Sequence, residues 1–312
     1  MAQTVIVPKF MTKSGYQILK QAGIKTITVD QLDEAAINKY GSQVNAAIVM
    51  LEPISNLLFK KAPQLKIIAR LGVGYNNIDL KTASEHGVVV TNTPDVNYQQ
   101  VAESIIGSVL FLAHDIYQRH QDLMNGHWNT GHTPAGRSIK GQTLGVIGYG
   151  RIGRTSAKMA AALGMKILVN NGSHPKTPSV GQAVDLKTLL AQSDFVSLSA
   201  PVTPETTGMI NQEALHQMKT SASLINFGRG DLIVHDDLVA ALKNHTIHSA
   251  ALDTFHTEPL PAGDELRQLD NVFLTPHIGG STVDAIDQGS KDSANEVVRV
   301  LNGQASQWRV NG

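Results

Sequence analysis

The chain contains no cysteine and no long apolar run. Without cysteine there are no disulfide bonds, no thiolate metal ligands and no cysteine nucleophile, and the composition fits a reducing compartment. No segment approaches the roughly 20 apolar residues that a membrane-spanning helix needs. The apolar stretch near the N-terminus is also too short for a signal peptide. We therefore expect a cytoplasmic protein that does not associate with a membrane.

The chain also lacks an excess of charge of either sign. Lys plus Arg and Asp plus Glu each number 26, so no basic field is present to attract nucleic acid or anionic lipid. The content of 42% hydrophobic and 17% charged residues is that of an ordinary globular protein. Because a single core rarely grows beyond roughly 250 residues, the 312 residues predict two domains.

Short apolar runs alternate with segments of helical periodicity, a pattern typical of βα units and parallel sheets. Strands are expected at Val5–Val7, Thr26–Val29, Ala47–Leu51, Ile67–Arg70, Val88–Thr91, Thr143–Ile147, Lys166–Asn170, Phe195–Ser199, Ser223–Asn226, Ser249–Leu252 and Val272–Leu274. Helices are expected at Ser14–Ala22, Asp79–His86, Asn97–Asn125 and Ser281–Leu301. The fold class predicted is α/β, with two Rossmann-like or flavodoxin-like doubly wound parallel-sheet domains and a cleft between them.

A glycine-rich turn joins the expected strand Thr143–Ile147 to a helix. Gly148, Gly150 and Gly153 form a G-x-G-x-x-G pattern in the strand–turn–helix context that a dinucleotide site requires. In such sites the first glycine makes a tight turn, the second lets the backbone approach the pyrophosphate, and the third allows close packing of helix on strand. The amides at the start of the helix then face the phosphates.

The next strand ends where an NAD site usually carries Asp or Glu for the ribose 2′-hydroxyl. Asn171 occupies that place. A carboxylate would repel a 2′-phosphate, whereas Asn171, Ser173, His174 and Lys176 each offer a hydrogen-bond donor to one. The missing negative charge favours NADP(H), although Asn171 is also able to hydrogen-bond the ribose of NAD(H).

Three residues at or just beyond strand-like segments supply the chemistry of a hydride-transfer site. Arg229 follows the run that ends in Asn226-Phe227-Gly228, Glu258 follows Leu252-Asp253-Thr254-Phe255, and His277 ends Leu274-Thr275-Pro276. Open α/β sheets bind ligands at this edge. None of the histidines His114, His120, His127, His132, His245 and His248 has metal-ligand spacing with a suitable partner, so no metal site is expected.

The expected reaction is the reversible reduction of a 2-keto acid. Hydride moves from the nicotinamide to the carbonyl carbon, and His277 gives a proton to the developing alkoxide or takes it back in oxidation. An adjacent Glu258 would favour the protonated imidazole. Arg229 offers a planar fork that binds a carboxylate through two hydrogen bonds and polarises the neighbouring carbonyl.

These segments together resemble the D-2-hydroxyacid dehydrogenase family, and the resemblance covers nearly the whole chain. It includes Arg70–Asp79, Val101-Ala102-Glu103, Gly126-His127-Trp128, Gly148–Gly153, Pro201–Thr206, Asn226–Gly230, Leu252–Phe255 with Glu258-Pro259, and Thr275–Gly280. The resemblance implies a discontinuous substrate domain, residues 1–97 with 281–312, around a dinucleotide-binding domain, residues 98–280. It also implies a homodimer formed through the long helices.

The resemblance further implies roles for particular residues. Arg229, Glu258 and His277 match the catalytic positions, and Val73 and Gly74, with Arg229 and His277, match the substrate-binding positions. Cofactor contacts are implied for Gly148, Gly150, Arg151, Ile152, Gly153, Asn171, Ala200, Pro201, Thr206, Phe227, Gly228, Asp253, Gly279 and Gly280. At the positions of Phe227 and Gly228 the family more commonly has Thr or Cys followed by Ala. We therefore expect the packing near the nicotinamide to differ from the family pattern.

The substrate is expected to be a small 2-keto acid such as glyoxylate, hydroxypyruvate or 2-ketogluconate. Phosphoglycerate dehydrogenase is the alternative within the class, although no cluster of Arg or Lys near the substrate loop indicates a phosphate. An NAD(H)-sensing binding protein, similar to corepressors built on this fold, is the alternative of another class. Retention of Arg229, Glu258 and His277 disfavours it.

Overall fold

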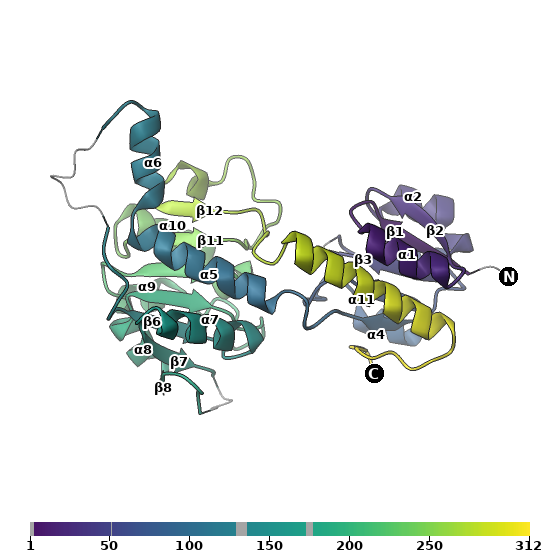
Figure 1. Cartoon of the computed structure of the whole chain (residues 1–312). Helices are drawn as coiled ribbons and strands as arrows, with labels where there is room; N and C mark the ends of the chain where they lie inside the picture. The colour runs from purple at the N-terminus through teal and green to yellow at the C-terminus, as the bar shows by residue number, and fades with distance from the viewer. Residues whose placement is uncertain (1–2, 51, 129–135, 173–176) are drawn as a thin grey trace. The chain divides into compact units, whose positions relative to one another are not determined.

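The computed structural model describes residues 3–50, 52–128, 136–172 and 177–312 (Figure 1). The chain divides into two compact units, Met1–Asn97 with Ser281–Gly312, and Tyr98–Gly280. Each unit contains one parallel sheet, of five and seven strands, and this confirms the predicted fold class. None of the described helices is long and apolar enough to cross a membrane.

The discontinuous unit is a five-stranded sheet in the order β2-β1-β3-β4-β5. Its strands are β1 (Thr4–Pro8), β2 (Lys25–Val29), β3 (Ala46–Val49), β4 (Ile67–Arg70) and β5 (Val89–Thr91). Its helices are α1 (Lys13–Gln21), α2 (Glu34–Tyr40), η1 (Gly41–Gln43), α3 (Leu57–Lys61), α4 (Leu80–Glu85) and α11 (Val283–Leu301). The strand order is that of a flavodoxin-like doubly wound sheet.

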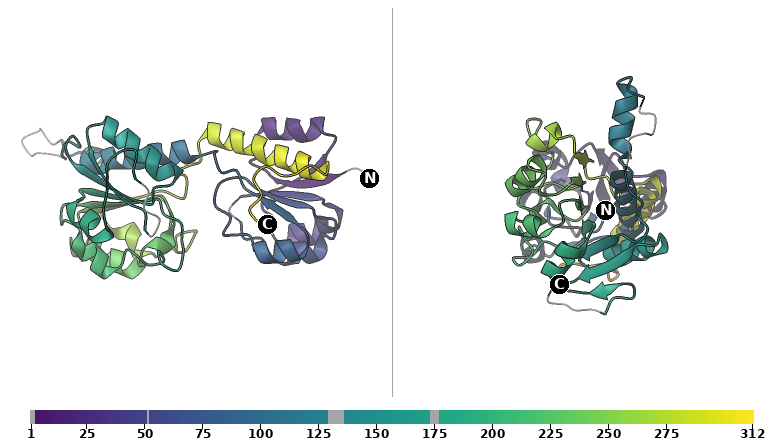
Figure 2. Two further views of the ribbon diagram at one scale, coloured as in Figure 1. Left: turned by 90° about the horizontal axis from the view of Figure 1, so that it is seen from below. Right: turned by 90° about the vertical axis from the view of Figure 1, so that its left-hand side faces the viewer.

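Alternate residues of each strand in this unit face opposite layers of helices. In β1, Val5 and Val7 join a core with residues of α1 and α11, whereas Ile6 joins a core with residues of α2, α3 and α4. Because both faces are covered, the strands read as continuous apolar runs rather than as alternating ones. The two layers of helices are visible in Figure 2.

The last residues of the chain extend the edge of this sheet. Val310 N–H donates to Val90 O (2.9 Å), and Asn311 Oδ1 accepts from Val90 N–H (2.7 Å). The carboxylate of Glu296 in α11 is 1% exposed and accepts from the N–H groups of Gln307 and Trp308. The unit therefore contains backbone from both ends of the sequence.

The Tyr98–Gly280 unit contains a seven-stranded sheet in the order β12-β11-β10-β9-β6-β7-β8. Its strands are β6 (Thr143–Ile147), β7 (Lys166–Asn170), β8 (Gln182–Ala183), β9 (Phe195–Leu198), β10 (Ser223–Asn226), β11 (Ser249–Leu252) and β12 (Val272–Leu274). The order is that of a Rossmann sheet. Along the chain, β7 and β8 are added on one side of β6 and β9 to β12 on the other side, so the strand order reverses between β6 and β9 although these strands are parallel. That switch point is where such sheets bind dinucleotides.

Helices cover both faces of this sheet (Figure 2). They are α5 (Tyr98–Ala113), α6 (Ile116–Met124), α7 (Arg151–Ala162), α8 (Leu186–Gln192), α9 (Gln212–Gln217), η2 (Gly230–Leu232), α10 (His235–Lys243) and η3 (Glu265–Gln268). Residues of α5 and α7 share a core with Leu144, Val146 and Phe195. Residues of α8, α9 and α10 share the core on the other face.

The expectation of one helix over Asn97–Asn125 is wrong. The helix ends at Ala113, and α6 begins after Asp115, whose φ of 53° is incompatible with a continuing right-handed helix. The carbonyl of Ala113 accepts from Arg137 N–H (2.6 Å), a partner distant in sequence that replaces the next helical donor. Helix α6 buries none of its residues in the chain, and Ile116, Tyr117, Leu123 and Met124 are exposed.

Candidate active site

The glycine turn has the geometry that its sequence pattern predicts. Gly148 has φ 93°, and a Cβ there would lie 2.5 Å from Ala200 N, so only glycine allows the loop after β9 to come so close. A Cβ on Gly153 would lie 2.0 Å from Gly148 O. Among the described residues other than Gly150 and its two chain neighbours, no heavy atom lies within 4 Å of the Cβ position of Gly150. The open approach lies at the N-terminus of α7, where Arg151 and Ile152 begin the helix.

Asn171 is joined to this turn by a hydrogen bond. Its Oδ1 accepts from Tyr149 N–H (2.7 Å), and the Tyr149 side chain is buried with its hydroxyl 3.2 Å from Ser179 Oγ. Because a backbone N–H bonds only to the amide oxygen, this contact fixes the orientation of the Asn171 amide. Ser173, His174 and Lys176, the other candidates near the adenosine ribose, lie outside the described residues.

Arg229 lies directly after the buried strand β10, in a turn that Asn226 organises. The Asn226 side chain is fully buried, accepts from Gly228 N–H (3.0 Å) and donates to Arg229 O (2.9 Å). The guanidinium of Arg229 donates to Gly228 O (2.8 Å). Burial lowers the pKa of Arg229, and the charge of Glu258 opposes that shift. An arginine in this setting still carries its positive charge at neutral pH.

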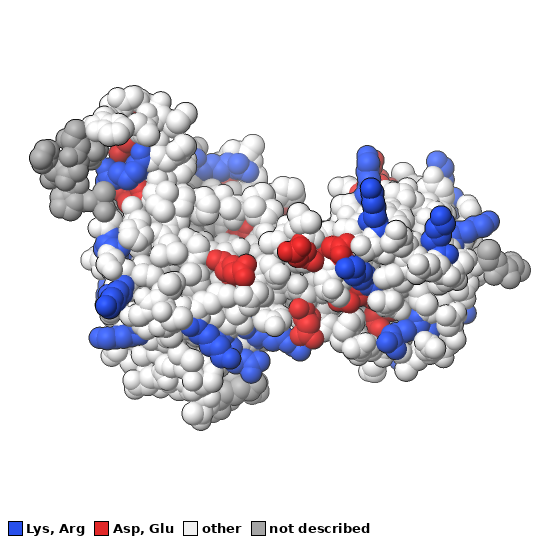
Figure 3. Space-filling model, in the orientation of Figure 1, with Lys and Arg blue, Asp and Glu red and all other residues white. Residues whose placement is uncertain are grey.

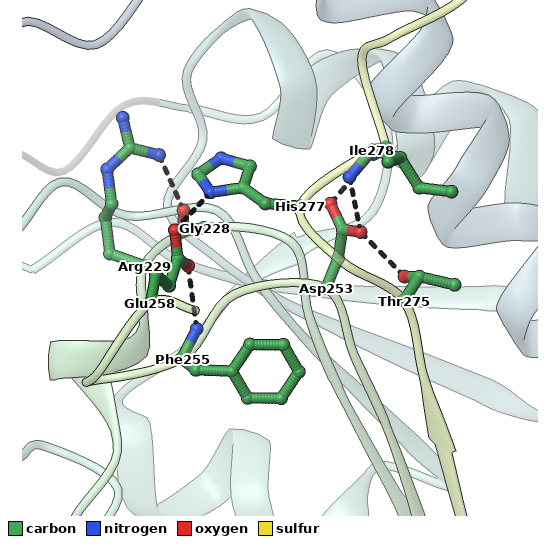
Figure 4. Close-up of polar contacts among 9 residues, drawn as sticks. Gly228, Arg229, Asp253, Phe255, Glu258, Thr275, His277 and Ile278 are labelled. Carbon is green, nitrogen blue, oxygen red and sulfur yellow. Dashed lines mark hydrogen bonds and ion pairs between the residues drawn. The ribbon is translucent and has the colours of Figure 1, made fainter. Parts of the chain in front are cut away.

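Glu258 and His277 are in direct contact, as Figure 4 shows. His277 Nδ1 lies 2.7 Å from Glu258 Oε2, and Phe255 N–H donates to Glu258 Oε1 (2.9 Å). Burial acts to raise the pKa of Glu258, but the hydrogen bonds from His277 and Phe255 and the charges of His277 and Arg229 outweigh it, so the pKa lies below its usual value. Glu258 is therefore an anion at neutral pH, and it holds the Nδ1 side of the imidazole.

The loop that carries His277 is anchored by Asp253, whose carboxylate is 2% exposed (Figure 4). Asp253 Oδ1 accepts from Thr275 Oγ1 (2.6 Å) and Ile278 N–H (2.8 Å), and Oδ2 accepts from Gly279 N–H (2.8 Å). His277 has φ 55°, a left-handed conformation that non-glycine residues seldom adopt. Such a conformation persists only where the surroundings hold it, and the three hydrogen bonds around it do so.

Phe227 and Gly279 meet beside this carboxylate. A Cβ on Gly279 would lie 2.5 Å from Phe227 Cδ1 and 2.9 Å from Asp253 Oδ2, so glycine is required for the contact. Phe227 is 9% exposed, and its ring packs in the core shared with α5 and α7. Ser104 of α5 donates to Gly279 O (3.0 Å), and Gly280 is the last residue of the unit.

The remaining predicted residues lie in two further places. Pro201 and Thr206 belong to the loop after β9, where Thr206 Oγ1 donates to Pro201 O (2.7 Å) and so closes the loop. Val73 and Gly74 belong to the discontinuous unit, after β4, where Asn92 Nδ2 donates to Val73 O (2.8 Å). Within the described ranges, the N–H groups of Val73 and Gly74 donate to no protein acceptor, an arrangement suited to an anion.

Sequence reasoning missed several residues that hold the site together. Thr275 and Tyr149 each position a predicted residue through one hydrogen bond, and Asn226 positions Gly228 and Arg229 through two. The signal for Asn226 is a polar residue that directly follows Leu224 and Ile225 at the end of a strand. His256 and Asp231 form an imidazole–carboxylate hydrogen bond between the two loops that carry Glu258 and Arg229, and no local pattern indicated it. No group of three or more His, Cys, Asp or Glu able to hold a metal occurs among the described residues.

The arrangement places a cation, an imidazole held by a carboxylate and a glycine turn at one edge of one sheet, the edge at which open α/β sheets bind ligands. Residues 106–279 match the model of the D-isomer specific 2-hydroxyacid dehydrogenase, NAD binding domain. The hydroxypyruvate reductase of Thermotoga maritima is 36% identical over 280 residues, 88% of this chain and 90% of that protein. The D-3-phosphoglycerate dehydrogenase of Methanocaldococcus jannaschii is 34% identical over 98% of this chain but only 59% of its own length.

Among solved structures, the NADPH-dependent glyoxylate/hydroxypyruvate reductase of Sinorhizobium meliloti, in complex with NADP and malonate, matches with a TM-score of 0.88. The match covers 99% of this chain and 97% of that one at 28% identity. The chain belongs to the D-isomer specific 2-hydroxyacid dehydrogenase family. It is an NAD(P)-dependent oxidoreductase that acts on the CH–OH group of small 2-hydroxy acids and on the corresponding keto acids.

Proposed function

We propose that the enzyme is a reductase of small, unphosphorylated 2-keto acids of the glyoxylate, hydroxypyruvate or 2-ketogluconate type. The observation that carries the proposal is the 2.7 Å contact between Glu258 and His277 beside the Arg229 turn. With Nδ1 held by the Glu258 carboxylate, Nε2 is the imidazole nitrogen that faces the substrate. In reduction, His277 gives the Nε2 proton to the alkoxide oxygen as hydride reaches the carbonyl carbon.

The other residues have binding and polarising roles in this proposal. Arg229 pairs with the substrate carboxylate and draws electron density from the adjacent carbonyl. The backbone N–H groups of Val73 and Gly74 are also proposed to bind the substrate carboxylate, since they lack protein acceptors within the described residues. The unit Tyr98–Gly280 is proposed as the dinucleotide domain and the discontinuous unit as the substrate domain.

The preferred cofactor is proposed to be NADP(H). The support is the Asn171 side chain directly after β7, which stands where a carboxylate is usual and whose oxygen accepts from Tyr149 N–H. The Asn171 side chain carries no negative charge, and its Nδ2 is a hydrogen-bond donor of the kind that suits the acceptor oxygens of a 2′-phosphate. The S. meliloti relative whose structure contains NADP is consistent with this preference.

Steady-state oxidation of NADPH and NADH against a panel of 2-keto acids tests the proposal. We expect the highest kcat/KM with glyoxylate, hydroxypyruvate or 2-ketogluconate and a lower value with 3-phosphohydroxypyruvate. His277→Gln should lower kcat by about 10²-fold with cofactor binding retained, since that is the usual contribution of a general acid. Unchanged turnover in His277→Gln would remove His277 from the mechanism. A preference for 3-phosphohydroxypyruvate would instead favour phosphoglycerate dehydrogenase.

The cofactor proposal has its own test. Asn171→Asp places a carboxylate beside the proposed 2′-phosphate, and we expect the ratio of kcat/KM for NADPH to that for NADH to fall at least tenfold. Gln182→Glu, at an exposed position of the adjacent strand β8, is the charge control. An unchanged ratio in Asn171→Asp would contradict the phosphate argument.

A homodimer is part of the same proposal. No residue of helix α6 is buried, and its side chains Ile116, Tyr117, Leu123 and Met124 are exposed. An exposed apolar face of this kind favours association with a second copy of the chain. Figure 3 shows charges of both signs on the displayed face of each unit. Light scattering at several concentrations tests the dimer, and a monomer at micromolar concentration would contradict it.

Cytoplasmic location stays a prediction, which cell fractionation tests.

A further inference from the structure

The loop that carries Glu258 is packed directly against the turn that carries Arg229. A Cβ on Gly230 would lie 1.9 Å from the carbonyl carbon of Phe255 and 2.2 Å from His256 N. The two backbone segments therefore touch at this point, one residue after Arg229 and two residues before Glu258. Only a glycine at 230 permits this contact, which fixes where the two loops cross.

A hydrogen-bonded imidazole–carboxylate pair lies beside this crossing. His256 Nδ1 pairs with Asp231 Oδ1, and the two side chains are 69% and 46% exposed. Asp231 is two residues after Arg229, and His256 is two residues before Glu258. Asp231 O also accepts from Gly208 N–H (2.8 Å), so the backbone on the Arg229 side is itself held. Because both side chains are largely exposed, the pair contributes little to the hydrophobic core.

A short series of contacts leads from this pair to the imidazole of His277. His256 follows Phe255, whose N–H donates to Glu258 Oε1 (2.9 Å). Glu258 Oε2 in turn holds His277 Nδ1 at 2.7 Å. A shift of His256 therefore moves the donor that orients the Glu258 carboxylate, and the carboxylate orients the imidazole.

We propose that His256 and Asp231 are positioning residues for the reaction. Their pairing, called the clip below, holds the Glu258 loop against the Arg229 turn and so sets the orientation of His277. The clip touches neither substrate nor cofactor in this proposal and acts through Glu258. The proposal rests on the roles assigned to Arg229, Glu258 and His277 above.

The loop that carries Glu258 also supplies a matched control, farther along the chain. His235 Nε2 of α10 lies 3.3 Å from Asp264 Oδ2, and both residues, with His256, line a surface cavity of about 300 Å³. The pair resembles His256–Asp231 in chemistry and in joining the loop to the segment after Arg229. Asp264 is six residues beyond Glu258, and its side chain accepts from Leu266 N–H, so it caps η3 rather than orienting the Glu258 carboxylate.

The experiment compares His256→Gln, Asp231→Asn, the double variant and the control His235→Gln by kcat, KM, cofactor Kd and Tm. We expect each clip variant to lower kcat about threefold, the scale of an exposed polar side-chain contact, with cofactor Kd unchanged. The double variant should lose no more than either single one, because both remove the same contact. His235→Gln should retain the kcat of the parent enzyme.

A swapped pair completes the test. Asp231→His combined with His256→Asp restores an imidazole–carboxylate pair, and we expect it to recover kcat. Wild-type kcat in His256→Gln, an equal loss in His235→Gln, or multiplied losses in the double variant would each overturn the clip. His277→Gln separates the two proposals: if it is inactive while His256→Gln matches the parent enzyme, only the clip fails, and if it is fully active, the proposed mechanism fails.

Discussion

Replacement of Asp253 by asparagine should both destabilise the enzyme and slow it. The Asp253 carboxylate is 2% exposed and accepts hydrogen bonds from Thr275, Ile278 and Gly279. An asparagine can keep the two bonds to Oδ1, but its NH₂ group then faces Gly279 N–H, so two donors oppose each other. A buried unsatisfied donor costs about 1–3 kcal/mol, so we expect the free energy of unfolding to fall by about 2 kcal/mol.

The same substitution should lower kcat, because the loop that Asp253 holds contains His277 in its left-handed conformation. If this loop shifts, the imidazole separates from Glu258, and we expect kcat to fall at least tenfold. Urea unfolding monitored by circular dichroism gives the stability, and saturating steady-state kinetics gives kcat. Asp270→Asn, at an exposed position in the same unit, controls for the change of charge. If Asp253→Asn matches the parent enzyme in both measurements, the anchoring argument is refuted.

Three further predictions concern the phosphate turn and the discontinuous unit. Gly153→Ala places a Cβ 2.0 Å from Gly148 O, and cofactor Kd measured by fluorescence titration should rise at least tenfold; an unchanged Kd would contradict the packing argument. Asp287 has its pKa lowered from 3.8 to about 2, chiefly by the hydrogen bond from Lys291, so its stabilising contribution is present above pH 3.8 and is lost as the pH falls towards 2. Asp287→Asn should therefore have a lower free energy of unfolding than the parent enzyme in urea at pH 6. The difference between the two should narrow below pH 3.8, and a difference that is constant with pH would refute this. Glu296→Gln should lower the unfolding free energy by about 1–2 kcal/mol, because the buried carboxylate holds the N–H groups of the C-terminal tail, whereas an unchanged urea midpoint would assign the tail no anchoring role.

Much of the fold was predictable because the sheets are covered on both faces. Buried parallel strands are short apolar runs bounded by glycine or polar residues, and the expected limits of Thr143–Ile147, Lys166–Asn170 and Ser223–Asn226 agree with β6, β7 and β10. The carboxyl ends of such strands share one edge, so Arg229 and Glu258 were expected to lie near each other from their local contexts alone.

The features that were not predicted depend on contacts between distant segments. The break after Ala113 follows from a left-handed Asp115 and from a hydrogen bond supplied by Arg137, neither of which alters the helical periodicity of the apolar residues. Strand β8 has only two residues and both are exposed, so it has no apolar pattern. The Asp253 anchor and the His256–Asp231 pair link residues more than 20 positions apart.

The pairing of Val310 and Asn311 with β5 has a consequence for the order in which the enzyme acquires its structure during synthesis. Tyr98–Gly280 is continuous, so its sheet is able to form on the ribosome as soon as its own residues have emerged. The first 97 residues contain all five strands of their own sheet, but one face of that sheet lacks α11, and its edge lacks Val310 and Asn311, until Tyr98–Gly280 has been made. While Tyr98–Gly280 is being synthesised, the apolar residues that α11 later covers stay exposed, and exposed apolar surface of this kind is prone to aggregation.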